Sequence, residues 1–321
     1  MSSLLKINDL KKYFPVHSGA FSQPTQFTHA VDGVSFEIKR GETLGLVGES
    51  GCGKTTLGRL TIRLLEPTEG KIIFDGNDLS NMDEKELRSF RNRFQIIFQD
   101  PYSSLNPRFN VERLVGEAML VHGKASKANL KEKVAFQLER VGISADYMKR
   151  YPHEFSGGQR QRIGIARALA LDPEFIVCDE PVSALDVSIQ AQIINLLQDL
   201  QKELNLALLF ISHDLNIVGH LSHEIAVMYL GRLVEKAPAK KLREKPSHPY
   251  TQALLSANPI PIPGKKLNRK ILFGDVPSPL DPPKGCRFHT RCPEVFEKCR
   301  SHSPKPVPLS DDHWVECHLY T

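Results

Sequence analysis

Short apolar runs, each followed by polar residues or glycine, divide the middle of the chain. They occupy residues 43–47, 94–98, 175–178 and 206–211. Runs of this length are typical of buried strands. Between the last two runs, spacings of three and four separate the apolar residues Ile189, Ile193, Leu197, Leu200 and Leu204. This spacing predicts an amphipathic helix, and a succession of strand, helix and strand predicts a parallel sheet.

The pattern changes near residue 236. Fourteen of the 22 prolines lie in the last 86 residues, where they interrupt any long periodic segment. We therefore expect a main domain over residues 1–235 and a small, loop-rich domain over residues 236–321.

Composition excludes several classes of protein. The chain has 321 residues, of which 40% are hydrophobic and 25% are charged, enough for a large core and two domains. The net charge of +5 is spread along the chain without a dense basic run, which argues against nucleic acid as a partner. No apolar stretch has the length of a membrane span, and the first residues do not resemble a signal peptide. We therefore expect a cytosolic protein with reduced thiols.

The segment GESGCGKTT at residues 48–56 follows an apolar run and matches G-x-x-x-x-G-K-[ST]. Gly48, Gly51 and Gly53 would let the backbone turn tightly, so that its N–H groups and the start of the next helix surround a phosphate. Lys54 would bind the β- and γ-phosphates, and Thr55 would bind Mg²⁺. The alternative is a glycine turn with a surface lysine.

The segment FIVCDEP at residues 175–181 is an apolar run that ends in two carboxylates. At the end of a strand, Asp179 could reach the Mg²⁺ shell and Glu180 could face the water that attacks the γ-phosphate. In the alternative interpretation, both acids only cap the next helix.

The segment FSGGQRQRIGIARAL at residues 155–169 begins with Ser156 and Gln159 at the spacing of a capping box. The simplest interpretation is a well-capped helix. The same helix start also offers N–H groups and a hydroxyl to a second phosphate. Two subunits facing head to tail would each lend this surface to the phosphate loop of the other.

These motifs, in this order, resemble the ATP-binding cassette ATPases over about residues 5–236. The resemblance implies a P-loop NTPase fold of the α/β class, with a RecA-like parallel sheet core, an antiparallel β subdomain and a helical signature subdomain at about residues 100–170. Residues 48–56 resemble the Walker A loop, residues 175–179 the Walker B strand, and residues 156–159 the signature motif, although Phe155 stands where the family usually has Leu.

The resemblance also implies roles for single residues. Gln99 resembles the Q-loop glutamine that senses Mg²⁺, His213 the switch histidine at the γ-phosphate, and Glu180 the catalytic glutamate. Asp186 resembles the D-loop aspartate at the dimer seam, and Tyr13 the aromatic residue that stacks on adenine. The implied catalytic residues are Glu180, His213 and Gln99, and those implied for Mg²⁺ are Thr55, Gln99 and Asp179. The implied nucleotide contacts are Tyr13, Gly48, Glu49, Ser50, Gly51, Cys52, Gly53, Lys54, Thr55, Thr56, Ser156, Gly157, Gly158, Gln159, Asp179 and Asp186.

Three further stretches resemble the ATP-binding subunits of dipeptide and oligopeptide importers: QDPYSSLNPR at residues 99–108, HPYTQALLSANP at residues 248–259 and PSPLDPPKGCRF at residues 277–288. Nickel and glutathione importers use similar subunits. The resemblance implies a peripheral ATPase on the cytoplasmic face of the plasma (inner) membrane. Its partners would be an identical or homologous cassette, two integral membrane permease subunits and, indirectly, an extracytoplasmic solute-binding protein.

Four of the six cysteines lie in the last 36 residues, with the spacing C-x5-C-x6-C-x17-C: Cys286, Cys292, Cys299 and Cys317. Zinc sites usually use C-x2-4-C pairs, which are absent here, whereas iron–sulfur clusters accept wider spacings. Spacing alone leaves zinc and iron–sulfur open, and the peptide-importer resemblance implies a [4Fe–4S] cluster. Four unliganded thiols are the third alternative.

The sequence argues against three other functions. A GTPase or small-molecule kinase would lack the signature helix, and the chain has no N-K-x-D motif that reads guanine. A non-transport cassette protein often joins two cassettes or carries a long coiled coil, and neither is found here. A regulatory subunit with an inert site would not need Lys54, Gln99, Asp179, Glu180 and His213 to be intact.

Overall fold

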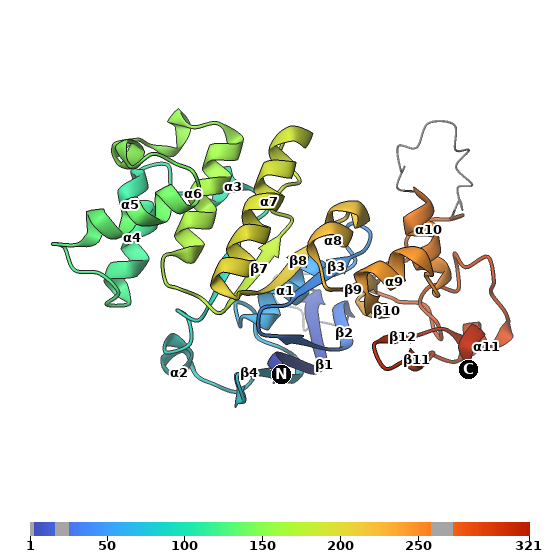
Figure 1. The fold of residues 1–321 in the computed structure, drawn as a ribbon. Helices are drawn as coiled ribbons and strands as arrows, with labels where there is room; N and C mark the ends of the chain where they lie inside the picture. Colours follow the sequence, from blue (N-terminus) through green and yellow to red (C-terminus); the bar gives the residue numbers. More distant parts are fainter. Residues whose placement is uncertain (1–2, 17–25, 258–271) are drawn as a thin grey trace, which may run out of the picture. The chain divides into compact units, whose positions relative to one another are not determined.

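The computed structural model describes residues 3–16, 26–257 and 272–321 (Figure 1). Contacts between residues divide the chain into two compact units. Within the described ranges, unit 1 contains residues 39–42 and 81–210, and unit 2 contains residues 3–38, 43–80 and 211–321.

Unit 1 combines parallel strands with helices. Its strands lie in the order β8, β7, β6, and β6 runs parallel to β7 with Phe94 beside Phe175 and Ile97 beside Cys178. Every residue of β7 and β8 is buried, which explains their unbroken apolar sequences. The strands are β6 (Phe94–Ile97), β7 (Phe175–Asp179) and β8 (Ala207–Ile211). The helices are α2 (Glu84–Arg88), α3 (Pro101–Ser104), α4 (Val111–Val121), α5 (Leu130–Arg140), α6 (Gly157–Leu169) and α7 (Val187–Leu204), with 3₁₀ turns η1 (Ala145–Lys149) and η2 (Pro152–Glu154).

The predicted amphipathic helix corresponds to α7. Of the apolar positions expected on its buried face, Ile193, Leu197 and Leu200 are buried, while Ile189 and Leu204 are half-buried. The helix ends at Asn205, which takes the left-handed backbone conformation (φ +51°) that often terminates helices. The spacing of apolar residues therefore predicted both the helix and its buried side.

Unit 2 contains an antiparallel sheet with strands in the order β2, β1, β4, β5. Its longest described pairing runs between β1 and β4, from Leu5 beside Phe74 to Lys11 beside Glu69. This is the antiparallel β subdomain that the sequence led us to expect. Its strands are β1 (Ser3–Val16), β2 (Gln26–Lys39), β4 (Glu69–Phe74) and β5 (Asn77–Asp78).

A second group of strands in unit 2 lies in the order β3, β9, β10, β12, β11. Strand β3 runs parallel to β9, whereas β10 pairs antiparallel with both β9 and β12. The strands are β3 (Thr43–Val47), β9 (Glu224–Tyr229), β10 (Arg232–Pro238), β11 (Val307–Ser310) and β12 (His313–Val315). The proline-rich tail thus extends a sheet through β12.

The helices of unit 2 are short. They are α1 (Lys54–Thr61), α8 (Leu215–Leu221), α9 (Ala239–Glu244), α10 (Pro249–Ala257) and α11 (Glu297–Ser301), with the 3₁₀ turn η3 (His318–Tyr320). Within the part of the chain that the structure describes, no helix combines the length and apolar character needed to cross a bilayer.

Candidate nucleotide-binding site

The glycine-rich loop lies in unit 2, between β3 and α1. Gly51 and Gly53 have left-handed backbone angles, with φ of +78° and +107°. A side chain at Gly53 would also bring its Cβ within 2.1 Å of the carbonyl oxygen of Ala30. Only glycine fits there. Gly53 therefore allows the tight turn that leads from the loop into α1.

Lys54 begins α1 and lies against the loop that precedes it. Its Nζ donates hydrogen bonds to the carbonyl oxygens of Gly48 (2.8 Å) and Glu49 (2.9 Å), and the residue is only 4% exposed. The first N–H groups of a helix have no acceptor within the helix, so these groups and the ammonium together favour an anion. That this loop binds phosphate stays a prediction.

In unit 1, Gln99, Asp179 and Glu180 lie at or just after the ends of strands β6 and β7. Asp179 is the last residue of β7 and is 2% exposed. Glu180 follows with φ of +45°, an unusual conformation for a non-glycine residue. The Nε2 of Gln99 donates to Oε2 of Glu180 over 3.0 Å. Because strained residues often occur at functional sites, the position of Glu180 supports its predicted role.

Helix α6 begins with the capping box that the sequence predicts. The Ser156 hydroxyl accepts from the Gln159 N–H (3.3 Å), and the Gln159 side chain accepts from the Ser156 N–H (3.0 Å). Ser156 and Gly157 are exposed. A Cβ at Gly158 would lie 2.5 Å from the Ile189 side chain of α7. The helix start is thus well capped and also open to solvent.

The remaining predicted residues occupy loops and one strand. His213 is exposed between β8 and α8, and Asp186 is exposed at the start of α7. Tyr13 lies on β1, and its ring centroid is 4.3 Å from that of His29. The adenine contact of Tyr13 stays a prediction.

Asp32, which sequence analysis missed, joins Tyr13 to two other parts of unit 2. It accepts hydrogen bonds from the Tyr13 hydroxyl (2.5 Å), from Arg232 (3.1 Å) and from Arg287. Burial alone would raise the pKa of Asp32, but the Tyr13 hydrogen bond and the charges of Arg287 and Arg232 outweigh burial and lower that pKa. The buried carboxylate therefore stays charged and stabilises the arrangement of Tyr13 and Arg287.

We expect Asp32→Asn to lower the free energy of unfolding at pH 7 by about 3 kcal/mol, because it leaves the buried Arg287 without its counter-charge. The folded-state pKa of Asp32 is depressed, so its stabilising effect is complete above about pH 4, the unfolded value, and disappears as the pH falls further. Urea unfolding between pH 7 and pH 3 tests this, with the exposed Asp281→Asn as the control. A difference between wild type and Asp32→Asn that persisted unchanged to pH 3 would contradict the assignment.

Two further residues that sequence analysis did not assign to the site contact Glu49 of the loop. Arg291 donates to its carboxylate over 2.7 Å, and the Glu49 N–H donates to the Tyr250 hydroxyl over 2.9 Å. Tyr250 lies in the HPYTQALLSANP stretch that resembles peptide importers, and Arg291 lies beside Cys292. Neither stretch has a local pattern that indicates contact with a residue some 200 positions earlier.

The four C-terminal cysteines are free thiols in one neighbourhood. The Cys286 N–H donates to the Cys299 carbonyl over 2.8 Å. Burial raises the pKa of Cys286 to about 12 and that of Cys292 to about 11, and Cys317 and Cys299 add to both shifts. However, among the described residues no three or more His, Cys, Asp or Glu side chains form a group that could hold a metal ion. The predicted [4Fe–4S] cluster and its zinc alternative are therefore not confirmed.

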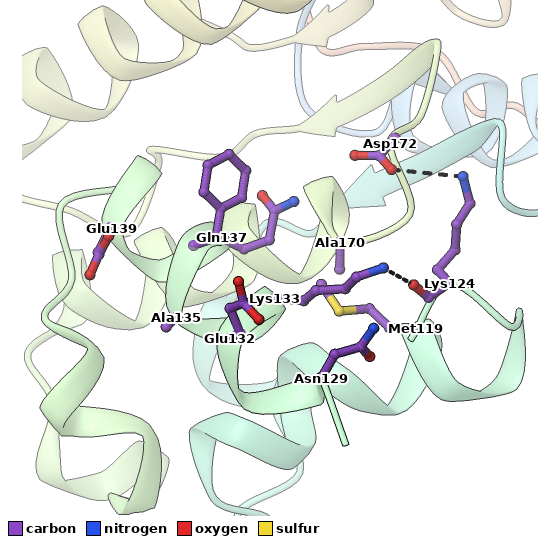
Figure 2. Close-up of a pocket in the computed structure, with 11 residues that line it drawn as sticks. Met119, Lys124, Asn129, Glu132, Lys133, Ala135, Gln137, Glu139, Ala170 and Asp172 are labelled. Atoms are coloured by element: carbon purple, nitrogen blue, oxygen red, sulfur yellow. Dashed lines mark hydrogen bonds and ion pairs between the residues drawn. The ribbon is translucent and has the colours of Figure 1, made fainter. Parts of the chain in front are cut away.

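Unit 1 also contains a hollow of about 780 Å³ beside α4 and α5 (Figure 2). Figure 2 shows Lys124 and Asp172 facing each other across one end, with their charged atoms 3.7 Å apart. Glu132, Lys133 and Glu139 line part of the remainder, and apolar and amide side chains line the rest. None of the predicted site residues lines this hollow, and it is distinct from the nucleotide site.

A phosphate loop after a buried strand, a strand-end Asp–Glu pair and an exposed capped helix start define a P-loop nucleoside triphosphatase of the cassette type. Residues 31–183 match the family model described as ABC transporter. Residues 234–299 match the model described as oligopeptide/dipeptide transporter, C-terminal region.

Known proteins agree with both matches. The chain is 53% identical to the oligopeptide transport ATP-binding protein AppF of Bacillus subtilis over 99% of this chain and 98% of that protein. It is 49% identical to the dipeptide transport ATP-binding protein DppF of Haemophilus influenzae over 98% of this chain and 96% of that protein. The dimeric ATP-binding cassette MJ0796, solved with ADP and Pi, is 26% identical over 73% of this chain and 98% of that one, with a TM-score of 0.64. The chain belongs to the ATP-binding cassette family and is an ATPase.

Proposed function

We propose that this chain is the ATP-hydrolysing subunit of a membrane importer for dipeptides or oligopeptides. The observation that carries the proposal is the C-terminal match at residues 234–299, since this region lies outside the part that matches the general ABC transporter model. Relatives named for oligopeptide and dipeptide transport, which match almost the whole chain, support it.

The proposed nucleotide site assigns one task to each part of the loop. The backbone of residues 48–56 surrounds the phosphates, while Lys54 neutralises the charge on the β- and γ-phosphates. Thr55 supplies a hydroxyl oxygen. Oxygen donors are the ligands that Mg²⁺ prefers, and bound Mg²⁺ would neutralise charge on the phosphates. Tyr13 would stack on the adenine.

Unit 1 supplies the groups proposed to act on the γ-phosphate. Asp179 offers a carboxylate to Mg²⁺, and Glu180 orients the attacking water. Because Gln99 uses its amide nitrogen to bond Glu180, its amide oxygen is the atom that can face the cation. His213, which belongs to unit 2, would contact the γ-phosphate. Most of the rate acceleration would come from positioning and charge, since phosphoryl transfer needs little covalent chemistry.

We further propose that two cassettes act as a head-to-tail pair. Ser156 and Gly157 are exposed at the positive end of α6, as a surface lent to a partner's phosphate loop requires. Asp186 is exposed as well, in keeping with a place at the seam. Closing on ATP and reopening after hydrolysis would drive the transport cycle.

The proposed partners are an identical or homologous cassette, two permease subunits and, indirectly, an extracytoplasmic solute-binding protein. This chain would lie on the cytoplasmic face of the plasma (inner) membrane. We propose that residues 1–235 form the cassette and residues 236–321 a C-terminal domain that packs on it.

We also propose that Cys286, Cys292, Cys299 and Cys317 hold a [4Fe–4S] cluster. Their mutual effect on pKa supports a shared neighbourhood. The thiolates of such a cluster bind separate iron atoms, so they lie farther apart than the ligands of a single zinc ion. The thiolates would fix the loops that carry them, while the cluster itself would supply a one-electron redox centre.

After anaerobic purification, we expect about four irons per chain, with a broad visible absorption band, and loss of both in Cys292→Ser. Cys52→Ser, which changes a cysteine outside the cluster, serves as the control for iron content. One zinc per chain would favour the zinc alternative, and absence of metal in fresh anaerobic protein would refute both.

A tag on this chain, followed by purification from membranes in mild detergent, tests the transport proposal. We expect permease subunits to co-purify and dipeptides or oligopeptides to increase ATP hydrolysis when the solute-binding protein is added. Stimulation by nickel or glutathione alone would indicate one of those importers instead. Recovery without any integral membrane protein would favour a non-transport cassette protein.

A further inference from the structure

Residues of the C-terminal region of unit 2 form hydrogen bonds with Glu49 of the nucleotide loop. Arg291 donates two hydrogen bonds to the Glu49 carboxylate, from Nη1 to Oε2 over 2.7 Å and from Nη2 to Oε1 over 3.1 Å. The Arg291 side chain is 8% exposed and that of Glu49 is 27% exposed. A two-bond pair of this kind fixes direction as well as distance, so the Glu49 side chain has a defined position.

A second contact fixes the backbone of the same residue. The Glu49 N–H donates to the Tyr250 hydroxyl over 2.9 Å. Tyr250 is fully buried, and its ring packs against Tyr229 and Phe288 with centroid separations of 4.7 and 5.3 Å. Close aromatic packing leaves the ring little freedom, which keeps the hydroxyl in place.

The start of α10, which carries Tyr250, is itself held by a buried carboxylate. Glu235 of β10 is 0% exposed and accepts from the N–H groups of Ser247 (2.8 Å) and His248 (2.9 Å). The His313 side chain lies 2.9 Å from the same carboxylate. A buried charge with several partners resists movement. Tyr250 is therefore anchored to the sheet of unit 2.

The backbone of Glu49 also contacts Lys54. Its carbonyl oxygen accepts from Lys54 Nζ over 2.9 Å and from the Cys52 N–H over 3.3 Å. The carboxylate, N–H and carbonyl of Glu49 are thus all engaged. Displacing Glu49 would move the acceptor that positions the lysine ammonium beside the phosphates.

We propose that Arg291 and Tyr250 are positioning residues for ATP binding, which hold Glu49 and, through it, Lys54 and the loop in the phosphate-binding conformation. This inference rests on the proposed nucleotide site. A loop held in its binding conformation before ATP arrives loses less entropy on binding, and this raises affinity. The C-terminal region then contributes to ATP binding by positioning the loop.

Equilibrium competition against a fluorescent ATP analogue, with Mg²⁺ and the full chain, tests the inference. Arg291→Gln is expected to raise the Kd for ATP about tenfold and the KM to a similar extent, with kcat at saturating ATP within about twofold of wild type. Tyr250→Phe removes one hydroxyl and is expected to raise the Kd about fivefold. Because both partners act in one pair, Arg291→Gln combined with Glu49→Gln should weaken binding no more than Arg291→Gln alone.

Arg300→Gln, which changes an exposed arginine of the same region, is the matched control and should bind as wild type does. Thermal unfolding of each variant separates affinity from stability. Should Arg291→Gln fail to fold, Glu49→Gln and Tyr250→Phe still decide the question. Folded variants with a lower melting temperature but an unchanged Kd would reduce these contacts to structural ones and overturn the inference. Failure of the wild-type chain to bind ATP would instead contradict the proposed nucleotide site.

Discussion

Glu180→Gln is expected to lower the rate of ATP hydrolysis by at least about 100-fold while ATP binding is retained. Glutamine has the shape of glutamate but cannot accept a proton from water. It can still accept the hydrogen bond that Gln99 donates over 3.0 Å, so the arrangement at the strand end should persist. Phosphate release at saturating ATP and the Kd for ATP, measured on the same preparation, would separate chemistry from binding.

The matched control is Glu203→Gln, which changes an exposed glutamate of unit 1 that pairs with Arg140 over 2.8 Å. The Glu203 side chain is 62% exposed and lies outside the proposed site, so this variant should hydrolyse ATP normally. Every cassette in the assembly must carry Glu180→Gln, or the partner must be inactive. Near-normal turnover under those conditions would show that Glu180 is not the catalytic glutamate.

Lys54→Ala is expected to raise the Kd for ATP about 30-fold or more, because hydrogen bonds to charged groups each contribute about 1.5–3 kcal/mol. The change removes the ammonium group that donates hydrogen bonds to the carbonyl oxygens of Gly48 and Glu49. It also removes the cation proposed to neutralise the β- and γ-phosphates. The effect should appear in binding itself, in contrast to Glu180→Gln.

Lys71→Ala provides the comparison, since Lys71 is an exposed lysine of β4 in the same unit. Surface changes of this kind usually alter stability by less than about 0.5 kcal/mol. If Lys54→Ala bound ATP as tightly as Lys71→Ala did, the loop at residues 48–56 would not be the phosphate site.

Elements whose pattern is local were predictable from the sequence. The strands β3, β6, β7 and β8 and the helix α7 follow from apolar runs and helical spacing. The capping box at Ser156 and Gln159 follows from a three-residue spacing. In each case the residues that determine the structure lie within a few positions of one another, so the pattern carries the information.

Contacts between distant parts of the chain were not predictable in this way. Asp32 meets Arg287 across 255 positions, and Arg291 meets Glu49 across 242. Such pairs depend on how the tail packs, and no periodicity encodes that. The strands β11 and β12 were missed because they are only four and three residues long, and β11 contains Pro308.

The sequence predicts that the tail is a small, loop-rich domain. Its contacts show that it also touches residues of the proposed nucleotide site. Through Tyr250 and Arg291 it touches the phosphate loop, and through Arg287 it touches Asp32 beside Tyr13. Changes in the C-terminal region are therefore expected to affect nucleotide binding as well as stability.

Peptide uptake into sealed vesicles tests the central claim most directly. The complex purified through a tag on this chain would be reconstituted with ATP and Mg²⁺ on the side that this chain faces, and labelled dipeptides or oligopeptides with the solute-binding protein on the other. The account predicts uptake that requires ATP and disappears when Glu180→Gln replaces the wild-type chain. Peptide accumulation that proceeded equally with Glu180→Gln, or ATP hydrolysis with no peptide movement in an intact complex, would contradict it.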